Sequence, residues 1–473
     1  MTNTALWTSK DAALATGGRT SGNWVANGVS IDTRTIEQGD LFVALTGEAR
    51  DGHLFVADAI AKGAAAALVS RAVEGVPPEK LLMVADTLDG LNALGRFARA
   101  RTNVRVAAVT GSVGKTSSKE ALKAILSAQG KTHASVASYN NLWGVPLTLA
   151  RMPADTQFAI IEIGMNHANE IRPLTKLARP HAALITTVEA VHIEHFDGIE
   201  GIADAKAEIF EGLEPGGTAI INHDNGQFAR VKAAAERAGA ADILSFGEAA
   251  GCDAALLAYA AAKGGSRVTA RVRGQTIAYV VGAPGRHLVQ NSLGILLVVS
   301  ALGGDVAKAA ASLAHVEAAK GRGSRSRIAL PGGSFELIDE SYNANPASMA
   351  AALALLGEAQ PGAQGRRIAV LGDMLELGPK GPAMHAGLIA PVRQAGCDLV
   401  FCSGTLMENL WAEVPANMRG AHAGSSAILL PLVDAAIRPG DVVMVKGSFG
   451  SRMGLIVEAL KSRQTVEGAV SRA

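Results

Sequence analysis

A glycine-rich turn between an apolar strand and a helix is the feature that most constrains the fold of this chain. The segment reads Val-Thr-Gly-Ser-Val-Gly-Lys-Thr over residues 109–116 and follows an apolar run. Gly111 and Gly114 allow successive backbone N–H groups to point at one anion, and Lys115 adds a positive charge for nucleotide phosphates. A helix predicted over residues 117–128 would place its positive end at the same anion. The pattern predicts an α/β domain that binds a nucleotide.

The general phosphate-loop pattern has a glycine five residues before Gly114, whereas this chain has Val109. We therefore interpret the loop as a shortened variant, and a chance glycine turn before a helix is the alternative. Thr116 follows the lysine, where its hydroxyl can bind Mg²⁺. The residues expected to hold the nucleotide phosphates are Thr110, Gly111, Ser112, Val113, Gly114, Lys115, Thr116 and Ser117.

Composition limits the classes of partner. Lys and Arg number 44 against 43 Asp and Glu, so the net charge of +1 gives no electrostatic basis for binding nucleic acid or an anionic membrane. We find neither a leader-like start nor an apolar run of about 18 residues, and we therefore expect a cytoplasmic protein without a membrane span. Cys252, Cys397 and Cys402 lack paired metal spacing and are expected to be buried thiols.

The chain has 473 residues, too many for one hydrophobic core. Alternating strand and helix signals predict an α/β protein of three domains. We expect a small N-terminal α/β domain over 1–103, a central ATP-binding domain with a mainly parallel sheet over 104–317, and a Rossmann-like doubly wound domain over 318–473. The basic stretch 320–327 is expected to be a flexible linker or active-site segment, with Arg322 as a candidate hinge residue.

Polar side chains follow several predicted strands of the central domain. Glu162 ends the apolar strand predicted over 158–163, and the carboxyl ends of parallel strands meet at the edge where the phosphate loop lies. Glu162 is thus a candidate magnesium ligand, with a structural ion pair as the alternative. His192 follows another strand and could meet a second cation, although a lone histidine after a strand is more often a structural residue. Lys206, on a predicted helix, would by itself be a solvated lysine.

A second polar group follows a strand of the last domain. Asp339, Asn343 and Asn345 could orient a ribose, a phosphate or a peptide, and the same residues could form a turn that caps the next helix. Lys446 also follows a strand, where it could bind an anion or cap the sheet edge.

Taken in order, these segments resemble the Mur ligase family, the ATP-dependent amide ligases that build the peptidoglycan stem peptide. The resemblance spans nearly the whole chain, and its most specific text is Tyr-Asn-Ala-Asn-Pro-Ala-Ser-Met over 342–349 with Gly-Asp-Met-Leu-Glu-Leu-Gly over 372–378. Further matching segments are Asp32–Arg34, Gly39–Phe42, Asp51–His53, Thr110–Glu120, Asn140–Thr148, Glu162–Gly164, Ala190–Glu194, Lys206–Ile209, Gly285–Asn291, Asp339–Met349 and Lys446–Ser448.

The resemblance implies roles for single residues. Lys115 would bind the phosphates, Thr116 and Glu162 one Mg²⁺, and His192 a second, while Lys206 matches the carbamylated lysine of the family and would be a further metal ligand. Lys115, Lys206 and His192 are the expected catalytic residues. The expected nucleotide contacts beyond the loop are Asn291, Arg322 and Asp339. The expected contacts to the UDP-sugar peptide are Asp32, Arg34, Asn140 and Asn141, and those near the incoming dipeptide are Asn343, Asn345 and Ser348.

Two segments depart from the family pattern. Val113 stands where asparagine is common, and residues 188–191 replace a more usual Asn-Ile-Gly-x-Ala before the histidine. Neither change removes a charged ligand.

The implied reaction joins D-alanyl-D-alanine to UDP-N-acetylmuramoyl-tripeptide with ATP, through an acyl phosphate. We expect a monomer whose domains close over the site. The sequence leaves open whether the third residue of the tripeptide is diaminopimelate or lysine. It also leaves open another Mur-type or a folylpolyglutamate-type ligase, and an ATP-hydrolysing switch protein. The Asp-Asn-Pro-Arg tetrapeptide of the third-residue ligase is absent, and the loop ends Gly-Lys-Thr-Ser rather than the Gly-Lys-Gly-Ser usual in folate ligases.

Overall fold

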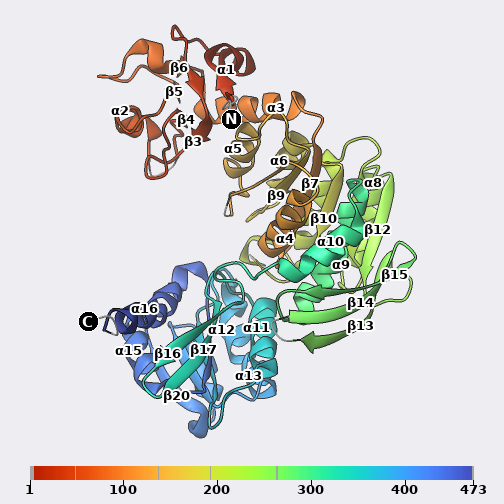
Figure 1. Ribbon diagram of the computed structural model, residues 1–473, viewed down its shortest axis with the longest axis vertical. Coiled ribbons are helices and arrows are strands. Elements are labelled where there is room, and N and C mark those ends of the chain that lie inside the picture. The colour runs from red at the N-terminus through yellow and green to blue at the C-terminus, as the bar shows by residue number, and fades with distance from the viewer. Residues whose placement is uncertain (1–4, 48–49, 137, 192, 263–264, 471–473) are drawn as a thin grey trace.

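The computed structural model describes residues 5–47, 50–136, 138–191, 193–262 and 265–470. Within these ranges the strands form three main sheets and a short two-stranded ribbon. The sheets fall one each in the segments 1–103, 104–317 and 318–473. Figure 1 places the first and last of these units at opposite ends of the long axis, with the central unit between them. Among the described residues, no helix is long and apolar enough to cross a membrane.

The N-terminal sheet has four parallel strands in chain order. They are β3 (Gly28–Ser30), β4 (Asp40–Val43), β5 (Ala66–Val69) and β6 (Leu81–Met83). Helices α1 (Ser9–Thr16) and α3 (Thr87–Ala100) cover one face and α2 (Val56–Ala61) the other. Helix α3 begins after Asp86, whose side chain accepts hydrogen bonds from two backbone N–H groups of the first turn.

The N-terminal core continues into the central domain. Leu147 and Ala150, from α5 (Gly144–Ala150), belong to the same buried cluster as Trp7. The Trp7 indole N–H donates to the Ala150 carbonyl at 2.8 Å, and the Arg101 guanidinium lies 4.5 Å from the Trp7 ring centre. The shared buried cluster and the indole hydrogen bond join the first two domains, whereas the Arg101–Trp7 contact lies within the N-terminal domain.

The central sheet has nine strands, and its phosphate-loop half is parallel. In spatial order they are β15 (Gln275–Val281), β14 (Gly265–Val272), β13 (Ala254–Ala262), β12 (Asp242–Gly247), β11 (Thr218–Asn222), β10 (Ala182–Ile185), β7 (Arg105–Thr110), β9 (Phe158–Glu162) and β8 (Thr132–Ala134). The strands β13 to β15 pair antiparallel, and the sequence did not indicate them. Strand β13 is rich in alanine, which is depleted in strands, and residues 257–261 are exposed without alternation.

Helices cover both faces of the central sheet. One face carries α4 (Lys115–Ser127), α9 (Arg286–Ala301) and α10 (Val306–Ser312), and the other carries α5, α6 (Ile171–Ala178), α7 (Ile199–Ala207) and α8 (Phe228–Arg237). Alanine and aliphatic residues make up most of both interfaces, in keeping with an aromatic content of only 4%.

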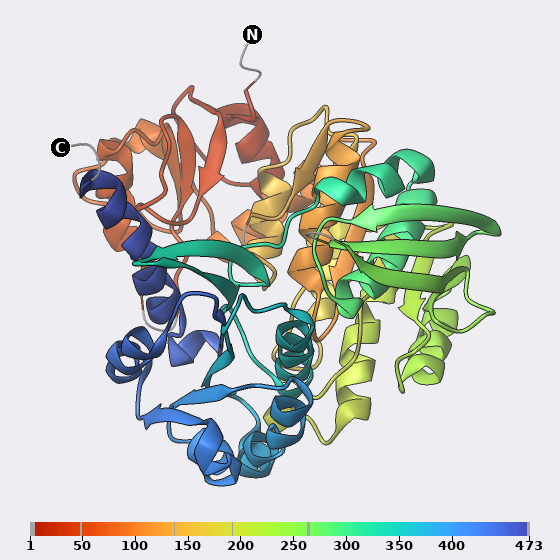
Figure 2. The same cartoon turned by 60° about the horizontal axis from the view of Figure 1, so that its bottom comes forward.

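The C-terminal sheet has six strands, of which five are parallel. Their order is β16 (Ser324–Leu330), β17 (Gly333–Glu340), β21 (Val442–Lys446), β18 (Arg367–Gly372), β19 (Leu399–Ser403) and β20 (Arg419–Ala423). One face packs against α11 (Pro346–Glu358), α13 (Ile389–Gln394) and α14 (Glu408–Glu413). The other packs against α15 (Ser426–Ala436) and α16 (Gly454–Val470). Figure 2 shows this unit as a separate layered body beside the central domain.

One local prediction was wrong in part. Residues 324–327 were expected to be flexible, but they form the first half of β16, which pairs antiparallel with β17. Arg325 and Arg327 are exposed at this sheet edge, while Ser324 and Ser326 alternate with them. The basic composition therefore reflects a solvated edge strand rather than a linker.

Candidate functional site

The phosphate loop joins the end of β7 to the start of α4 and requires its two glycines. Gly111 has φ +149° and Gly114 has φ +87°, both in the region that favours glycine. A Cβ atom on Gly111 would lie 1.9 Å from the Thr186 hydroxyl, and one on Gly114 would lie 2.5 Å from the Asn291 amide nitrogen. The Thr186 hydroxyl in turn donates to the Val113 carbonyl at 2.6 Å, which holds the turn in place.

Lys115 folds back over this loop. Its ammonium group donates to the Gly111 carbonyl at 2.5 Å. Burial lowers the pKa of Lys115 to about 8, with nearby Arg322 lowering it further and the Glu162 carboxylate opposing both. A bound anion such as a phosphate would raise the pKa of Lys115 again, because nearby negative charge favours the protonated lysine.

Glu162 ends β9 beside the loop and is fully buried. Its Oε1 accepts hydrogen bonds from the Thr116 hydroxyl at 3.0 Å and from the Asn140 amide at 2.8 Å. Its Oε2 is buried and has no hydrogen-bond partner among the residues that the structure describes. An unpaired buried carboxylate oxygen is costly, and a hard cation such as Mg²⁺ prefers carboxylate and hydroxyl oxygens. The Glu162 and Thr116 pair therefore fits a magnesium ion.

Lys206 lies on α7 with only 2% of its surface exposed. Burial and the neighbouring Lys115 hold the pKa of Lys206 well below its usual range, which favours an uncharged amine. His192, predicted as a ligand of a second cation, lies outside the described residues. Within the described part of the chain, no group of three His, Cys, Asp or Glu residues is arranged to hold a metal.

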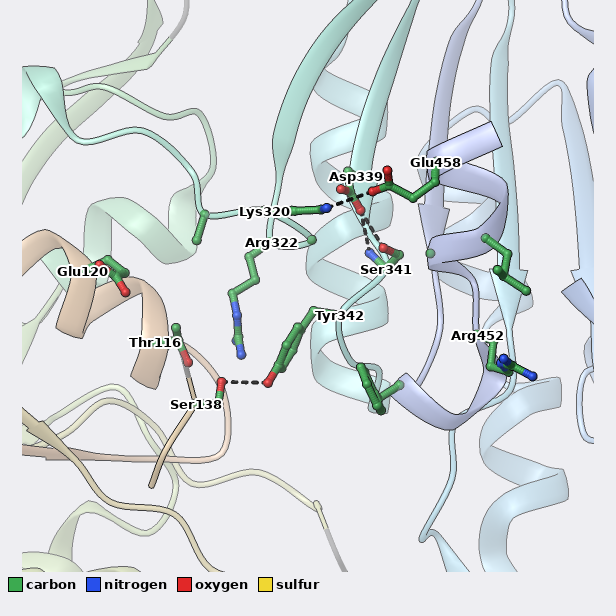
Figure 3. A pocket seen from close by; sticks show the side chains of 15 residues that line it. Thr116, Glu120, Ser138, Lys320, Arg322, Asp339, Ser341, Tyr342, Arg452 and Glu458 are labelled. Atoms are coloured by element: carbon green, nitrogen blue, oxygen red, sulfur yellow. Dashed lines mark hydrogen bonds and ion pairs between the residues drawn. The ribbon is translucent and has the colours of Figure 1, made fainter. Parts of the chain in front are cut away.

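A cavity of about 750 Å³ lies between the central and C-terminal domains (Figure 3). The Arg322 side chain extends across it between Thr116 and the Tyr342 ring, and its guanidinium lies 4.1 Å from the ring centre. Asp339 lies at the far side and is 1% exposed. The Asp339 carboxylate accepts from the Ser341 hydroxyl at 2.7 Å and contacts the Lys461 ammonium at 3.3 Å.

Asn291 is placed next to this cavity rather than in it. It lies on α9, against Gly114, and lines a smaller cavity behind the phosphate loop that Arg322 also lines. The loop, Asn291, Arg322 and Asp339 are thus gathered at one junction of two domains.

A second cavity of about 700 Å³ lies on the other side of Tyr342. Its lining includes Lys115, Asn141, Asn343 and Asn345. It therefore places the end of the phosphate loop opposite the polar segment that follows β17.

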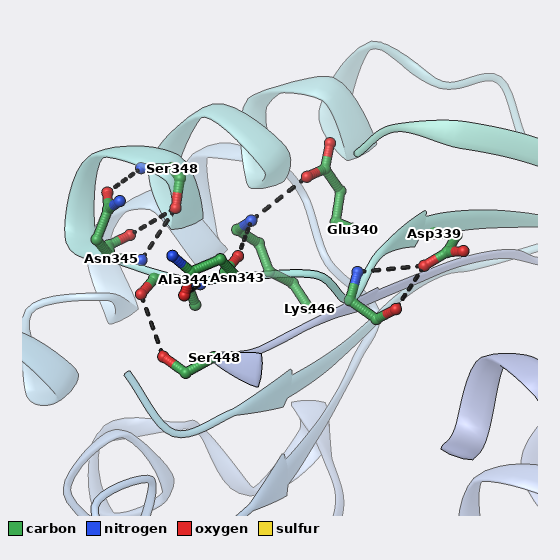
Figure 4. Close-up of polar contacts among 9 residues, drawn as sticks. Asp339, Glu340, Asn343, Ala344, Asn345, Ser348, Lys446 and Ser448 are labelled. Atoms are coloured by element: carbon green, nitrogen blue, oxygen red, sulfur yellow. Dashed lines mark hydrogen bonds and ion pairs between the residues drawn. The ribbon is translucent and has the colours of Figure 1, made fainter. Parts of the chain in front are cut away.

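The polar contacts after β17 are largely internal to the C-terminal domain (Figure 4). The Lys446 ammonium donates to the Asn343 carbonyl at 2.8 Å and contacts the Glu340 carboxylate at 3.3 Å. Burial lowers the pKa of Lys446. Its role as a cap of the sheet edge therefore agrees with its contacts.

Asn345 and Ser348 form a capping box at the start of α11. The Asn345 side chain accepts from the Ser348 backbone N–H at 2.9 Å, and the Ser348 hydroxyl accepts from the Asn345 backbone N–H at 3.0 Å. The predicted cap at this turn is confirmed, and Asn345 lines the second cavity as well.

The four residues expected at the UDP-sugar peptide lie in two places. The Asp32 carboxylate accepts the backbone N–H of Arg34 at 2.9 Å and also binds its guanidinium, and the Arg34 side chain is 82% exposed on the N-terminal domain. Asn140 and Asn141 belong to the central domain and point to different partners. Asn140 binds Glu162, and the Asn141 side chain accepts from the Gly144 N–H at 3.0 Å at the start of α5.

Comparison with known proteins identifies the family. Three family models cover the chain: the Mur ligase family catalytic domain over residues 25–102, the Mur ligase middle domain over 109–299, and the Mur ligase glutamate ligase domain over 326–449. The chain belongs to the Mur ligase family.

Sequence similarity to known relatives extends over nearly the full length of this Mur ligase. A UDP-N-acetylmuramoyl-tripeptide–D-alanyl-D-alanine ligase from Rickettsia prowazekii is 32% identical, with 96% of this chain and 99% of the relative covered. The enzyme of the same name from Escherichia coli is 36% identical, with 92% and 94% covered.

Solved structures agree. The crystal structure of MurF from Acinetobacter baumannii superposes with a TM-score of 0.84 at 30% identity, covering 96% of this chain and 99% of that one. MurF ligase from Thermotoga maritima, solved in complex with ADP, shares the fold with a TM-score of 0.77 at 23% identity, covering 93% and 98%. The predicted family, the three-domain α/β fold and the ligase class are confirmed.

Sequence reasoning about this Mur ligase missed several residues at the domain junction. Tyr342 and Phe449 line both large cavities, Ser138 contacts Tyr342, and Lys461 contacts Asp339. A tyrosine within a polar strand-end segment was a usable signal, because the chain has only 4 tyrosines. Lys461 carried no local signal, since it lies 122 residues from Asp339.

The prediction for the cysteines is confirmed. Cys252, Cys397 and Cys402 are free and buried, and burial raises the pKa of Cys397 and of Cys402 to about 12. The raised pKa of Cys397 and of Cys402 disfavours the thiolate, which is the reactive form of cysteine.

Proposed function

We propose that this protein is an ATP-dependent ligase that joins D-alanyl-D-alanine to UDP-N-acetylmuramoyl-tripeptide in peptidoglycan synthesis. The relatives named for this reaction match over more than nine-tenths of the chain. The observation that carries the proposal is the arrangement of two cavities around the end of the phosphate loop. Thr116 lines one and Lys115 the other. A nucleotide and an acceptor can thus approach the same phosphates from different sides.

The reaction follows from the charges. A carboxylate is a poor electrophile, so the terminal carboxylate of the tripeptide attacks the γ-phosphate of ATP, the bond to the β-phosphate oxygen breaks, and ADP leaves. The amine of D-alanyl-D-alanine then attacks the acyl carbon, a tetrahedral intermediate forms, and inorganic phosphate departs as the amide is made. Lys115 and the loop N–H groups would neutralise the phosphate oxygens, and Arg322 would reach the nucleotide from the C-terminal domain.

Thr116 and Glu162 would hold a Mg²⁺ ion, with His192 and Lys206 at a second. Bound there, Mg²⁺ supplies positive charge that offsets the repulsion between the attacking carboxylate and the phosphates. The buried Oε2 of Glu162, which has no hydrogen-bond partner among the described residues, supports this assignment.

Carbamylation of Lys206 is part of the proposal. CO₂ reacts with an uncharged amine, and burial next to Lys115 favours that form of Lys206. The product is a carboxylate-like group, which reverses the charge and supplies oxygen ligands. Lys206→Ala should lose turnover, and added acetate or bicarbonate should restore part of it. Full activity of Lys206→Ala without rescue would refute the role, and Lys232→Ala, at an exposed position of α8, serves as the control.

We assign Asn291, Arg322 and Asp339 to the nucleotide. The surface of Asp32 and Arg34, with Asn140 and Asn141 across the domain junction, is assigned to the UDP-sugar peptide. The segment of Asn343, Asn345 and Ser348 is assigned to the dipeptide. The boundaries at 103/104 and 317/318, the monomeric state and the cytoplasmic location stay predictions of the sequence.

Phosphate release tests the proposal. Purified protein with ATP and Mg²⁺ would be offered UDP-N-acetylmuramoyl-tripeptide and D-alanyl-D-alanine singly and together. Release only with both, together with a product heavier by the dipeptide less one water, would support the ligase. Release that needs neither would refute it and favour the ATP-hydrolysing switch instead. Parallel assays with diaminopimelate-containing and lysine-containing tripeptides would settle the third residue.

A further inference from the structure

Tyr342 connects two domains at the junction where the two large cavities meet. It follows β17 of the C-terminal domain, and its hydroxyl donates to the Ser138 hydroxyl of the central domain at 2.7 Å. Ser138 stands two residues before Asn140, which binds the Glu162 carboxylate. The tyrosine thus joins the C-terminal domain to the segment that holds the buried carboxylate of the phosphate site.

The ring of Tyr342 has a second partner. The Arg322 guanidinium lies 4.1 Å from its centre, a distance at which the negative ring face attracts a cation. Arg322 is also close enough to Lys115 to lower the pKa of that lysine. In Figure 3 the Arg322 side chain runs between Tyr342 and Thr116. The ring therefore fixes the direction of a guanidinium that faces the phosphate loop.

The same ring separates the two cavities. Tyr342 and Phe449 line both, and their ring centres lie 6.0 Å apart. Phe449 is 76% exposed, so this wall is built from aromatic surface that faces the cavities rather than a domain core.

We propose that Tyr342 is a positioning residue that orients Arg322 for the nucleotide and, through its hydrogen bond to Ser138, holds the C-terminal domain against the central domain. By holding the wall between the cavities, it also keeps water from the activated acyl group. The second part rests on the proposed ligase function, whereas the first concerns nucleotide binding alone.

The test uses five variants of the full chain. Tyr342→Phe and Ser138→Ala each remove the hydroxyl contact, and the double variant removes both of its partners. Tyr342→Leu also removes the ring face beneath Arg322. Tyr259→Phe is the matched control, because Tyr259 is a partly exposed tyrosine on β13.

The first readout is the affinity for ADP, measured by calorimetry without other substrates. Loss of one hydrogen bond predicts weakening of about fivefold for Tyr342→Phe and for Ser138→Ala. The double variant should be no weaker than either single variant, because both lose the same contact. Tyr342→Leu should weaken binding by about tenfold beyond Tyr342→Phe. Tyr259→Phe should bind as the wild type does.

The second readout is the number of phosphates released per amide formed. With both substrates present, the wild type should release one phosphate for each amide, whereas Tyr342→Leu should release more than one. With the tripeptide alone, where no amide can form, Tyr342→Leu should release phosphate faster than the wild type. Wild-type ADP affinity in Tyr342→Leu, or additive losses in the double variant, would overturn the proposal. A wild-type chain that forms no amide would refute the ligase function, and the ADP affinities would still decide the role of Tyr342.

Discussion

Raising the pH should weaken nucleotide binding through one identifiable group, Lys115. Burial lowers the pKa of this lysine from 10.5 to about 8 in the protein without ligands, so it loses its charge as the pH passes through 8. Bound phosphates would restore the charge, because they favour the protonated amine. Nucleotide binding should therefore take up a proton from solution.

The size of this uptake follows from the pKa. With a bound-state pKa back near the ordinary value of lysine, uptake should be about 0.1 proton at pH 7, about 0.5 at pH 8 and about 0.9 at pH 9. The dissociation constant should rise about twofold at pH 8 and about tenfold at pH 9 relative to neutral pH. Lys115 also makes the stability of the free protein increase with pH between about 8 and 10.5, because the unfolded chain binds this proton more tightly than the folded one.

Calorimetry of ADP binding in pairs of buffers with different ionisation enthalpies measures the uptake directly. Lys115→Arg is the matched variant, since arginine keeps its charge throughout this range and should take up no proton. If the wild type takes up no proton at pH 9, or Lys115→Arg takes up as much as the wild type, the pKa of Lys115 is not depressed and the argument from its burial is wrong.

Three further predictions concern the phosphate site and the turn beside it. Gly111→Ala should destabilise the protein by about 2–5 kcal/mol, because the new Cβ meets the Thr186 hydroxyl and the backbone conformation is strained for alanine. Gly216→Ala is the control: at φ +82° in open space it should lose only the stability that the backbone strain removes. Equal losses in the free energy of unfolding of the two variants, measured by urea denaturation, would contradict this reasoning. Glu162→Gln should keep a carbonyl acceptor for Thr116 yet lower the ligation rate about a hundredfold at a given Mg²⁺ concentration, and a Mg²⁺ titration identical to that of the wild type would argue against a metal ligand. Asn345→Ala should lower stability by about 1 kcal/mol through loss of the helix cap, an effect that unchanged thermal unfolding would rule out.

Local features of the fold could be predicted from the sequence because their causes are local. The strand, glycine turn and lysine of the phosphate loop are contiguous, and the predicted helix over 117–128 differs from α4 by two residues at its start and one at its end. The buried carboxylate of Glu162 at a strand end also followed from its apolar neighbours.

Other features depend on partners far along the chain. Strands β13 to β15 take their stability from pairing with one another, and the alanine-rich β13 gives no alternating pattern. The basic residues of β16 form an edge strand because the strand pairs with β17. The contact of Tyr342 with Ser138 spans 204 residues, and no local pattern encodes it.

The packing of Trp7 against α5 has a consequence for motion. Since the N-terminal core contains residues of a central helix, the first domain cannot swing away without exposing apolar surface and breaking the bond from the Trp7 indole to Ala150. Opening and closing of the enzyme should therefore occur at the other junction, where the Tyr342–Ser138 hydrogen bond crosses between the central and C-terminal domains beside two cavities. The first two domains would then move together as one rigid body, and the third domain would move relative to them. A fragment of residues 1–103 alone would lack part of its hydrophobic core.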